Sequence, residues 1–470
     1  MSLDNLSKEE LIEIIHRQAK HIDQLTAKFE ELQKQLAKNS HNSNKPPSSD
    51  GLKKQRRTKS ERKASGKSPG GQPGHKGHYL ALSTTPDQVV RHTVTDCTGC
   101  GYSLSETPIR GIQRRQVWDI PPLALTITEH QVEQKKCPCC GIQNKACFPE
   151  QVAHTVQYGS RIQAFLVYLH HGQLLPYQRT MDVMRDLFGH TISQGTLANI
   201  IQRTTTLVAP LVDEIKTNLL QSPVVHIDET GMNVLPKRQW VHVYSTVEET
   251  FYALHPNRGK KAINAIGFLP TYTGIAVHDA WQSYFTYTNC RHALCNAHIL
   301  RELTYLHEQE GHAWAGMFHE LLIQMKLEVD LYAQARMPLP ETYRDQWVYA
   351  YDLLLREASD NLQVNYTQHQ QKQRKSMRRS PARNLLDRFV MHRDKILFFL
   401  HDPQVPFDNN QAERDLRMIR VKEKISGLFR SEEGAQAFFM IRSFLSTAHK
   451  RGKQLLEALQ QVLDKTYNLQ

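Results

Sequence analysis

The first periodic feature of the chain is a seam of apolar side chains in residues 6–37. Its members follow a four-three alternation that Gln18 completes: Leu11, Ile15, Ile22, Leu25, Phe29, Leu32 and Leu36. A stripe with this spacing is typical of a coiled coil, in which a polar residue can fix register or partner number. The alternative is a single amphipathic helix packed on its own domain. We favour self-association, because the stripe is narrow and a basic segment follows it directly.

Residues 151–215 show a second helical pattern. Within them, the stretch 176–203 has an apolar-patterned helix, a break at Gly189 and a second helix that Ser193 can cap. Two helices joined by a short turn that contains glycine are typical of a helix-turn-helix, so we predict a helix-turn-helix-like DNA-binding region here. Its second helix would enter the major groove. A helical hairpin with a purely structural role has the same pattern and remains the alternative.

From Ser222 onward the pattern alternates between strands and helices. Four runs rich in Val, Ile and aromatic residues predict strands: 223–232, 238–247, 250–256 and 273–280. Helical periodicity follows to about residue 400, and a further helix is expected over about 408–425. We therefore predict a catalytic core of mixed strands and helices from 216–303 and 391–440. A helical insertion (304–390) and a C-terminal helix (441–470) complete this half of the chain.

The segment 38–80 separates the N-terminal helix from the rest. It has almost no large apolar side chains and many Ser, Pro, Gly, Lys and Arg residues. Such a composition cannot bury a core, so we expect a basic disordered linker. Its concentrated charge would neutralise DNA phosphates through Lys53, Lys54, Arg56 and Arg57. A plain solvated linker is the alternative.

Composition and charge limit the class of protein. The 470 residues allow roughly two to four domains. Hydrophobic residues make up 40% and mean hydropathy is −0.54, and no apolar run approaches the roughly 18 residues of a membrane helix. The polar N-terminus has no export signal, so we expect a cytoplasmic protein. A net charge of +12 favours a polyanionic partner, although a merely basic protein is compatible with it.

Six of the eight cysteines lie between Cys97 and Cys147. The sequences Cys97-Thr-Gly-Cys100-Gly and Cys137-Pro-Cys-Cys140-Gly are two knuckles, and four thiolates at this spacing are typical of a structural Zn²⁺ site. Cys139 is a substitute ligand for the second knuckle. We predict a zinc-binding domain over 81–150, with short strands at 111–120 and 125–137.

Three acidic residues form the candidate catalytic set. Asp228 closes the apolar run 224–227 and Asp279 closes the run 275–278, so each lies where a strand leaves a sheet. Glu413 lies on the helix expected over 408–425. Three carboxylates can bind two Mg²⁺ ions that grip the attacking and leaving oxygens of a phosphodiester. Taken from spacing alone, three acids among 47 are weak evidence.

Neighbouring residues have simpler roles. Glu229 should point to the face of the strand opposite Asp228. Asp408 or Asn409 can cap the last helix, and Asp415 faces away from Glu413. Cationic residues that could contact DNA follow Glu413 on its own helix face or lie in the insertion, namely Arg417, Arg420 and the stretch 372–383.

Several segments closely resemble the transposases of insertion sequence 66. They are 226–232, 278–285, 290–303 and 405–435, together with the linker motifs 38–50 and 70–77 and both cysteine knuckles. The resemblance implies a multidomain α+β and α/β protein with a ribonuclease-H-like catalytic core. It also implies an Asp-Asp-Glu triad of Asp228, Asp279 and Glu413 that uses Mg²⁺ or Mn²⁺. Ala280 departs from relatives, which more often have a polar residue before the tryptophan.

The segment Cys295-Asn-Ala-His298 is similar to a Cys-x-x-His element that follows the second aspartate in several transposase groups. His298 is therefore a candidate to contact DNA or to position a catalytic group, whereas the alternative is a role in supporting the helix.

The function that these features predict is a DNA transposase. Its partners would be double-stranded DNA (element ends and target), further copies of the chain, and small accessory proteins. A nuclease of the same fold uses the same ligands and is one alternative. A non-catalytic DNA-binding regulator derived from a transposase is the other.

Overall fold

A computed structural model describes residues 8–38, 80–370 and 380–469 of the chain. It separates into two compact units: residues 1–52, 129–186 and 190–470 form the larger, and residues 53–128 and 187–189 the smaller. The linker 38–80 and the residues proposed there for phosphate contacts, Lys53, Lys54, Arg56 and Arg57, lie outside the described residues apart from its ends. Within the described part of the chain, no helix combines the length and apolar character needed to cross a membrane.

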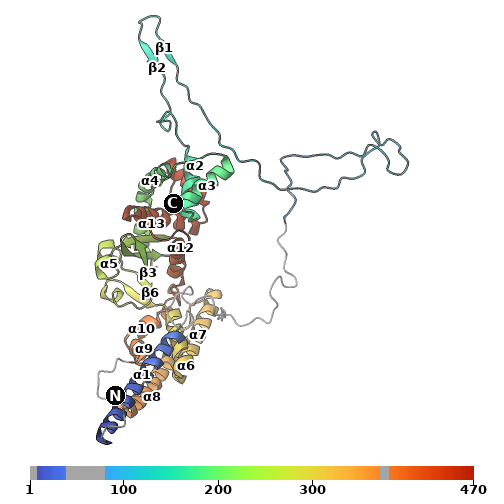
Figure 1. The fold of residues 1–470 in the computed structure, drawn as a ribbon. Helices are drawn as coiled ribbons and strands as arrows, with labels where there is room; N and C mark the ends of the chain where they lie inside the picture. Colours follow the sequence, from blue (N-terminus) through green and yellow to red (C-terminus); the bar gives the residue numbers. More distant parts are fainter. Residues whose placement is uncertain (1–7, 39–79, 371–379, 470) are drawn as a thin grey trace. The chain divides into compact units, whose positions relative to one another are not determined.

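The centre of the larger unit is a five-stranded sheet with the strand order β5-β4-β3-β6-β7 (Figure 1). The strands are β3 (Val224–Val234), β4 (Lys237–Ser245), β5 (Thr250–His255), β6 (Ile275–His278) and β7 (Arg291–Leu294). β3, β4 and β5 form an antiparallel meander, whereas β6 and β7 run parallel to β3. β3 is therefore the central strand, with antiparallel neighbours on one side and parallel neighbours on the other.

Both faces of the sheet are covered by helices. Val225 and Ile227 of β3 pack against α4 (Gln194–Gln221) and α5 (Lys260–Ile266). Met232 and Val234 of the same strand pack against α12 (Asn410–Ser426) and α13 (Glu432–Lys450). Because side chains alternate along a strand, the even-numbered residues of β3, Asp228 among them, belong to the face that α12 covers.

The outer strand β5 is bound to a helix in place of another strand. Its Thr250 N–H donates to Thr447 Oγ1 (3.0 Å), and its Tyr252 N–H donates to Ser443 Oγ (3.0 Å). Ser443 and Thr447 lie four residues apart on α13 and so share one helix face. The hydroxyl side chains of α13 thus satisfy backbone groups that an edge strand leaves unpaired.

A helical region follows β7 and shares a core with β6 and β7. It consists of α6 (Asn296–Glu310), α7 (Ala313–Gln334), α8 (Glu341–Gln370), α9 (Pro381–Met391), α10 (Arg393–Ile396) and α11 (Phe398–His401). The described part of the segment 304–390 is therefore mostly helical, as its periodicity predicted. The other elements are α1 (Lys8–Ala37), α2 (Ser160–Val167), the π-helix η3 (Tyr168–Gly172), α3 (Tyr177–Phe188), the 3-10 helix η4 (Tyr284–Thr286) and α14 (Leu455–Leu463).

The helical pair expected over 176–203 is present. Helix α3 ends at Phe188, Gly189 adopts a φ of +62°, and Ser193 Oγ accepts the N–H of Thr196 (3.0 Å) at the start of α4. The glycine takes a left-handed conformation that most residues avoid, and the serine satisfies one of the free N–H groups of the helix.

The strands expected between the two cysteine knuckles are mostly absent, and that prediction was wrong. Residues 111–133, all of them described, form no strand, and only β1 (Gln134–Lys136) pairs with β2 (Gln143–Lys145). Val117 and Ile127 are both 92% exposed. A strand pattern becomes a strand only when a neighbour satisfies its backbone and buries one face, and these residues have neither.

Candidate active site

The two aspartates lie beside each other on neighbouring parallel strands. Asp228 lies within β3, which continues to Val234, so the expectation that a strand ends at Asp228 was wrong. β3 pairs with β6 so that His226 is opposite Val277. Extending this register by two residues places Asp228 beside Asp279, which directly follows β6. Both belong to the face of the sheet that carries α12, since side chains two residues apart on a strand point the same way. Apolar runs ending in aspartate therefore bring the two carboxyl groups together.

The environment of these carboxyl groups disfavours their charge. Burial, followed by the negative charges of Glu229 and Asp279, raises the pKa of Asp228 well above its usual range. Burial also raises the pKa of Asp279, although the N–H of Trp281, which its Oδ1 accepts at 3.1 Å, opposes this effect. A group of like charges in a half-buried position binds cations, because a cation removes their mutual repulsion.

Glu413 enters the site from the first turn of α12. Its Oε1 lies 3.7 Å from Nδ1 of His298, and its Oε2 lies 3.6 Å from Nη2 of Arg301. Its charge also contributes to the raised pKa of Asp228, so the three acids share one electrostatic environment. Oxygen donors of this kind suit Mg²⁺ or Mn²⁺, and Glu413 Oε1, which is buried without a hydrogen bond, has a free position for an ion.

The tightest group of metal-binding side chains among the described residues differs from the predicted triad. It consists of Cys295, His298 and Glu413, whose donor atoms all lie within 4.8 Å of one another. Burial lowers the pKa of His298 to about 4 and raises that of Cys295 to about 12. The imidazole is therefore neutral at physiological pH. The structure places His298 beside the third acid, whereas the two aspartates are paired with each other by the sheet.

A pocket opens beside Asp279 and brings in a residue from the helical region. Arg388 on α9 lines it, and its positive charge opposes part of the rise that burial causes in the pKa of Asp279. Arg388 also forms an ion pair with Glu302 of α6. The remaining lining residues are Ala280, Leu294, Cys295, His298, Ile299, Phe389 and Ile396. The helical region thus contributes a cation to the site.

Glu229 lies on the other face of the sheet, as predicted. It is 8% exposed, its Oε1 accepts hydrogen bonds from Arg258 Nε (2.8 Å) and Nη2 (2.6 Å), and its Oε2 accepts from the hydroxyl of Tyr284. The guanidinium of Arg258 in turn lies 4.4 Å from the ring centre of Trp281. Because these partners use both carboxylate oxygens, Glu229 holds β3 in place from the face of the sheet opposite Asp228.

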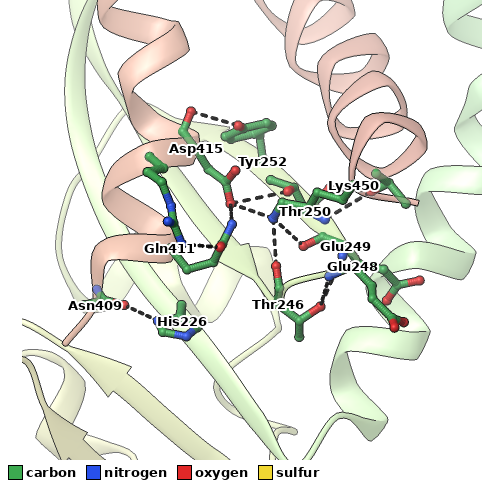
Figure 2. Close-up of polar contacts among 12 residues, drawn as sticks. His226, Thr246, Glu248, Glu249, Thr250, Tyr252, Asn409, Gln411, Asp415 and Lys450 are labelled. Atoms are coloured by element: carbon green, nitrogen blue, oxygen red, sulfur yellow. Dashed lines mark hydrogen bonds and ion pairs between the residues drawn. The ribbon is translucent and has the colours of Figure 1, made fainter. Parts of the chain in front are cut away.

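Asn409 connects the elements that carry the site residues (Figure 2 shows its contact with His226). The Nδ1–H of His226 donates to Asn409 Oδ1 (2.8 Å), and Asn409 Nδ2 donates to the carbonyl of Ile227 (2.8 Å). The backbone N–H of Asn409 donates to Cys295 Sγ (3.1 Å). The side chain does not cap α12, although Asn409 occupies the N-cap position. Asn409 is only 1% exposed. Its amide instead holds the start of α12 against β3 at Ile227, the residue before Asp228.

Replacing Asn409 by leucine is expected to reduce the DNA cleavage predicted from the sequence by about 10²-fold, because misplacing reacting groups by about 1 Å has effects of this size. It should also lower the free energy of unfolding by about 1–3 kcal/mol, since the Ile227 carbonyl and His226 lose buried partners. Turnover and DNA affinity should be measured together. A loss of affinity at unchanged turnover would contradict a positioning role. Asn410→Leu, at an exposed position one residue on, is the control.

A second buried network holds α12 against the sheet (Figure 2). Lys450 Nζ lies 2.8 Å from Asp415 Oδ2, and each side chain is only 11% exposed. Lys450 also donates to the carbonyls of Thr246 (2.8 Å) and Glu249 (3.1 Å), and the hydroxyl of Tyr252 donates to the carbonyl of Asp415 (3.0 Å). Asp415 thus faces away from the site, as expected, and joins the helix of Glu413 to α13 and the β4–β5 hairpin.

Each cysteine knuckle has a tight backbone turn of its own. In the first, the N–H of Gly101 donates to the carbonyl of Cys97 (2.9 Å), and in the second Gly141 donates to Cys137 (2.9 Å). Both glycines have positive φ, at +75° and +74°. Backbone N–H groups, those of Gly99 and Cys140 foremost, lower the pKa of Cys97 and Cys137 respectively. All eight cysteines are described and none is in a disulfide, so these thiols are free to bind zinc.

Arg417 and Arg420, which follow Glu413 on α12, are exposed. Arg420 donates to the carbonyl of Gly231 (3.1 Å) and pairs with Glu423 (2.9 Å), while Arg417 faces solvent. The basic stretch 372–383 lies mostly outside the described residues. On α4, the first turns expose polar side chains of the kinds that read base edges, namely Gln194, Asn199, Gln202 and Arg203.

Comparison with known families matches three parts of the chain. Residues 155–437, which contain the sheet and all three acids, match the transposase IS66 family. Residues 95–141 match the zinc-finger binding domain of transposase IS66, and residues 2–81 match a family of unknown function (DUF6444). No curated protein matched the chain. These matches define a transposase with a zinc-binding domain.

The transposase match extends over more than half of the chain, so the chain belongs to the IS66 transposase family. The zinc-finger match spans both knuckles and supports zinc binding by this segment.

Sequence reasoning did not find Arg301, Arg388 or the long-range role of Asn409. Arg301 could have been noticed, because it lies three residues after His298 and shares its helix face. Arg388 has no such signal, since 109 positions separate it from Asp279 and only the packing of α9 brings the two together.

Proposed function

We propose that the chain is a DDE transposase with a ribonuclease-H-like core that cuts and joins DNA through Asp228, Asp279 and Glu413. The observation that carries the proposal is the register of β3 and β6, which sets Asp228 of β3 beside Asp279 at the end of β6, on the face of the sheet that carries the helix of Glu413. The strand order, with an antiparallel meander on one side of β3 and parallel strands on the other, supports it.

In this proposal the three carboxylates hold divalent metal ions, and the ions when bound neutralise the charge that develops on the phosphate. Asp228 is central, because the charges of both other acids raise its pKa. Arg388 and Arg301 would stabilise phosphate oxygens at the pocket beside Asp279. Water attacks the phosphodiester at the element end and a 3′-hydroxyl leaves. That hydroxyl then attacks a target phosphodiester by the same in-line displacement, so no covalent protein–DNA intermediate is needed.

DNA would be held by several basic and polar surfaces. The linker residues Lys53, Lys54, Arg56 and Arg57 would neutralise phosphates, as would Arg417 and Arg420 near the site. The exposed start of α4 would read the element end. The proposed zinc ligands are Cys97, Cys100, Cys137 and Cys140, which would close the metal shell and give the zinc a structural role. We also propose that the protein acts in the cytoplasm at the nucleoid and works with small accessory proteins.

Helix α1 is proposed to join copies of the chain. Four of its seam residues are exposed, from 53% for Leu25 to 61% for Ile22, and a second copy would bury them. Deleting residues 1–37 should reduce the native mass measured by light scattering to that of one chain. Leu25→Lys should have the same effect, whereas Gln24→Lys, at an exposed position off the seam, should have none. An unchanged mass after the deletion would remove α1 from the interface.

Cleavage of an end-labelled duplex carrying the element terminus is the test of the proposed function. We expect nicking at the element boundary in Mg²⁺ or Mn²⁺, none in a chelator, and joined products when target DNA is added. Cutting without joining would instead favour the nuclease. Tight end binding with no cutting in either metal, even with the accessory proteins supplied, would favour the DNA-binding regulator.

A further inference from the structure

The chain contains a second group of potential metal ligands besides the cysteine knuckles. Cys295 is the N-cap residue of α6 and His298 lies three residues later, so both side chains stand on one turn of the helix. Glu413 reaches the same point from the first turn of α12. The donor atoms of these residues lie within 4.8 Å of one another. A thiol, an imidazole and a carboxylate from two helices thus converge.

The atoms that face each other in this group lack hydrogen bonds. His298 Nδ1 and Glu413 Oε1 are both buried and unpartnered, and they are 3.7 Å apart. This distance is too long for a hydrogen bond between them. It fits two ligands of one ion, since nitrogen and oxygen each bind zinc at about 2.0–2.2 Å. The other oxygen of Glu413 faces Arg301 at 3.6 Å, which leaves Oε1 directed at the imidazole.

Two features of the backbone around Cys295 suit a sulfur ligand of a metal ion. The backbone N–H of Asn409 donates to its Sγ at 3.1 Å, as outer-shell donors do to metal-bound sulfur. Cys295 also stands at the N-terminus of α6, where the partial positive charge of a helix of 15 residues favours an anion. A shift of about 1 Å would bring all three donors to zinc distance.

We propose that Cys295, His298 and Glu413 bind a Zn²⁺ ion, in a site separate from the four cysteines of the knuckles. The donor set selects the metal, because sulfur and imidazole favour zinc whereas Mg²⁺ prefers oxygen ligands alone. Three protein ligands leave a fourth position of the ion open. The site shares Glu413 with the proposed triad, but zinc binding requires neither DNA nor cleavage, so it goes beyond the proposed function and can be tested without DNA.

The test is the zinc content of the full chain, dialysed against buffered zinc with excess Mg²⁺ and then analysed for metal. We expect about two zinc ions per chain in the wild type and about one in His298→Ala or Cys295→Ser. The double variant Cys97→Ser/Cys100→Ser should lose the other ion. His307→Ala, an exposed histidine on the same helix, is the matched control and should retain both.

One zinc ion in the wild type, or the wild-type content in both Cys295→Ser and His298→Ala, would overturn the proposal. Loss of zinc in Asp228→Asn with retention in Cys295→Ser would also overturn it, because the aspartates would then be the ligands. Circular dichroism of each variant identifies unfolding, and Cys295→Ser changes a single atom, so the test remains if His298→Ala fails to fold. A wild type that binds two zinc ions but does not cut DNA would refute the proposed function alone.

Discussion

Replacing Asp228 by asparagine is expected to reduce metal-dependent cutting by about 10³-fold or more. Asparagine keeps the size of the side chain but removes the charge that would bind the ions. Asp228 is the acid whose pKa responds to Asp279 and Glu413 together, so its loss affects every ion that the three acids share. Because the variant also relieves repulsion among buried carboxyl groups, its free energy of unfolding should not fall.

The measurement is the rate of nicking of the labelled duplex in saturating Mn²⁺, with end binding measured separately in a chelator. Binding should be retained, because the proposed DNA contacts are made by cationic and polar side chains that the substitution of Asp228 leaves unchanged. Asp213→Asn, which alters an exposed acid on α4, is the control and should cut at the wild-type rate. An Asp228→Asn protein that cuts within about tenfold of the wild type would refute the proposed triad.

Replacing Lys450 by methionine is expected to lower the free energy of unfolding by about 3–5 kcal/mol. Methionine fills much of the volume of lysine, so the main effect is that the carboxylate of Asp415 stays buried without its cation. The Lys450–Asp415 pair is only 11% exposed on either side, and water cannot replace the lost partner. Two backbone carbonyls, of Thr246 and Glu249, also lose their donor.

Urea unfolding of the Lys450→Met protein should show this loss as a lower midpoint at an unchanged slope. Lys453→Met is the matched control, because Lys453 is exposed three residues further on and should have little effect. The double variant Asp415→Leu/Lys450→Met should recover a large part of the stability, since neither charge then remains buried. A loss below about 1 kcal/mol for Lys450→Met would mean that Asp415 is solvated and does not anchor α12.

Much of the fold follows from local pattern. The apolar runs before Asp228 and Asp279 predicted both strands, although only β6 ends at its aspartate and β3 continues to Val234. Alternation along β3 placed Glu229 on the far face. The break at Gly189 and the cap at Ser193 were predicted for the same reason, because each depends on the conformation of a few consecutive residues. These features needed no knowledge of the rest of the chain.

The remainder depends on contacts between distant parts of the chain. Asp408 or Asn409 was expected to cap the helix of Glu413, yet the amide of Asn409 binds His226 and Ile227, more than 180 positions away. The grouping of Glu413 with Cys295 and His298 likewise requires two helix starts to meet. The segment 111–133 illustrates the opposite error, because its alternating pattern lacks the partner that a strand requires.

The closure of β5 by α13 has a consequence for how copies of this protein associate. An open strand invites another chain to add to the sheet, and this route leads to domain exchange and to fibrils. Ser443 and Thr447 already occupy the donors of Thr250 and Tyr252 that an incoming strand would need. Intermolecular growth of the sheet on this side is therefore blocked in the folded state, and a Ser443→Val/Thr447→Val protein would open a route to aggregation.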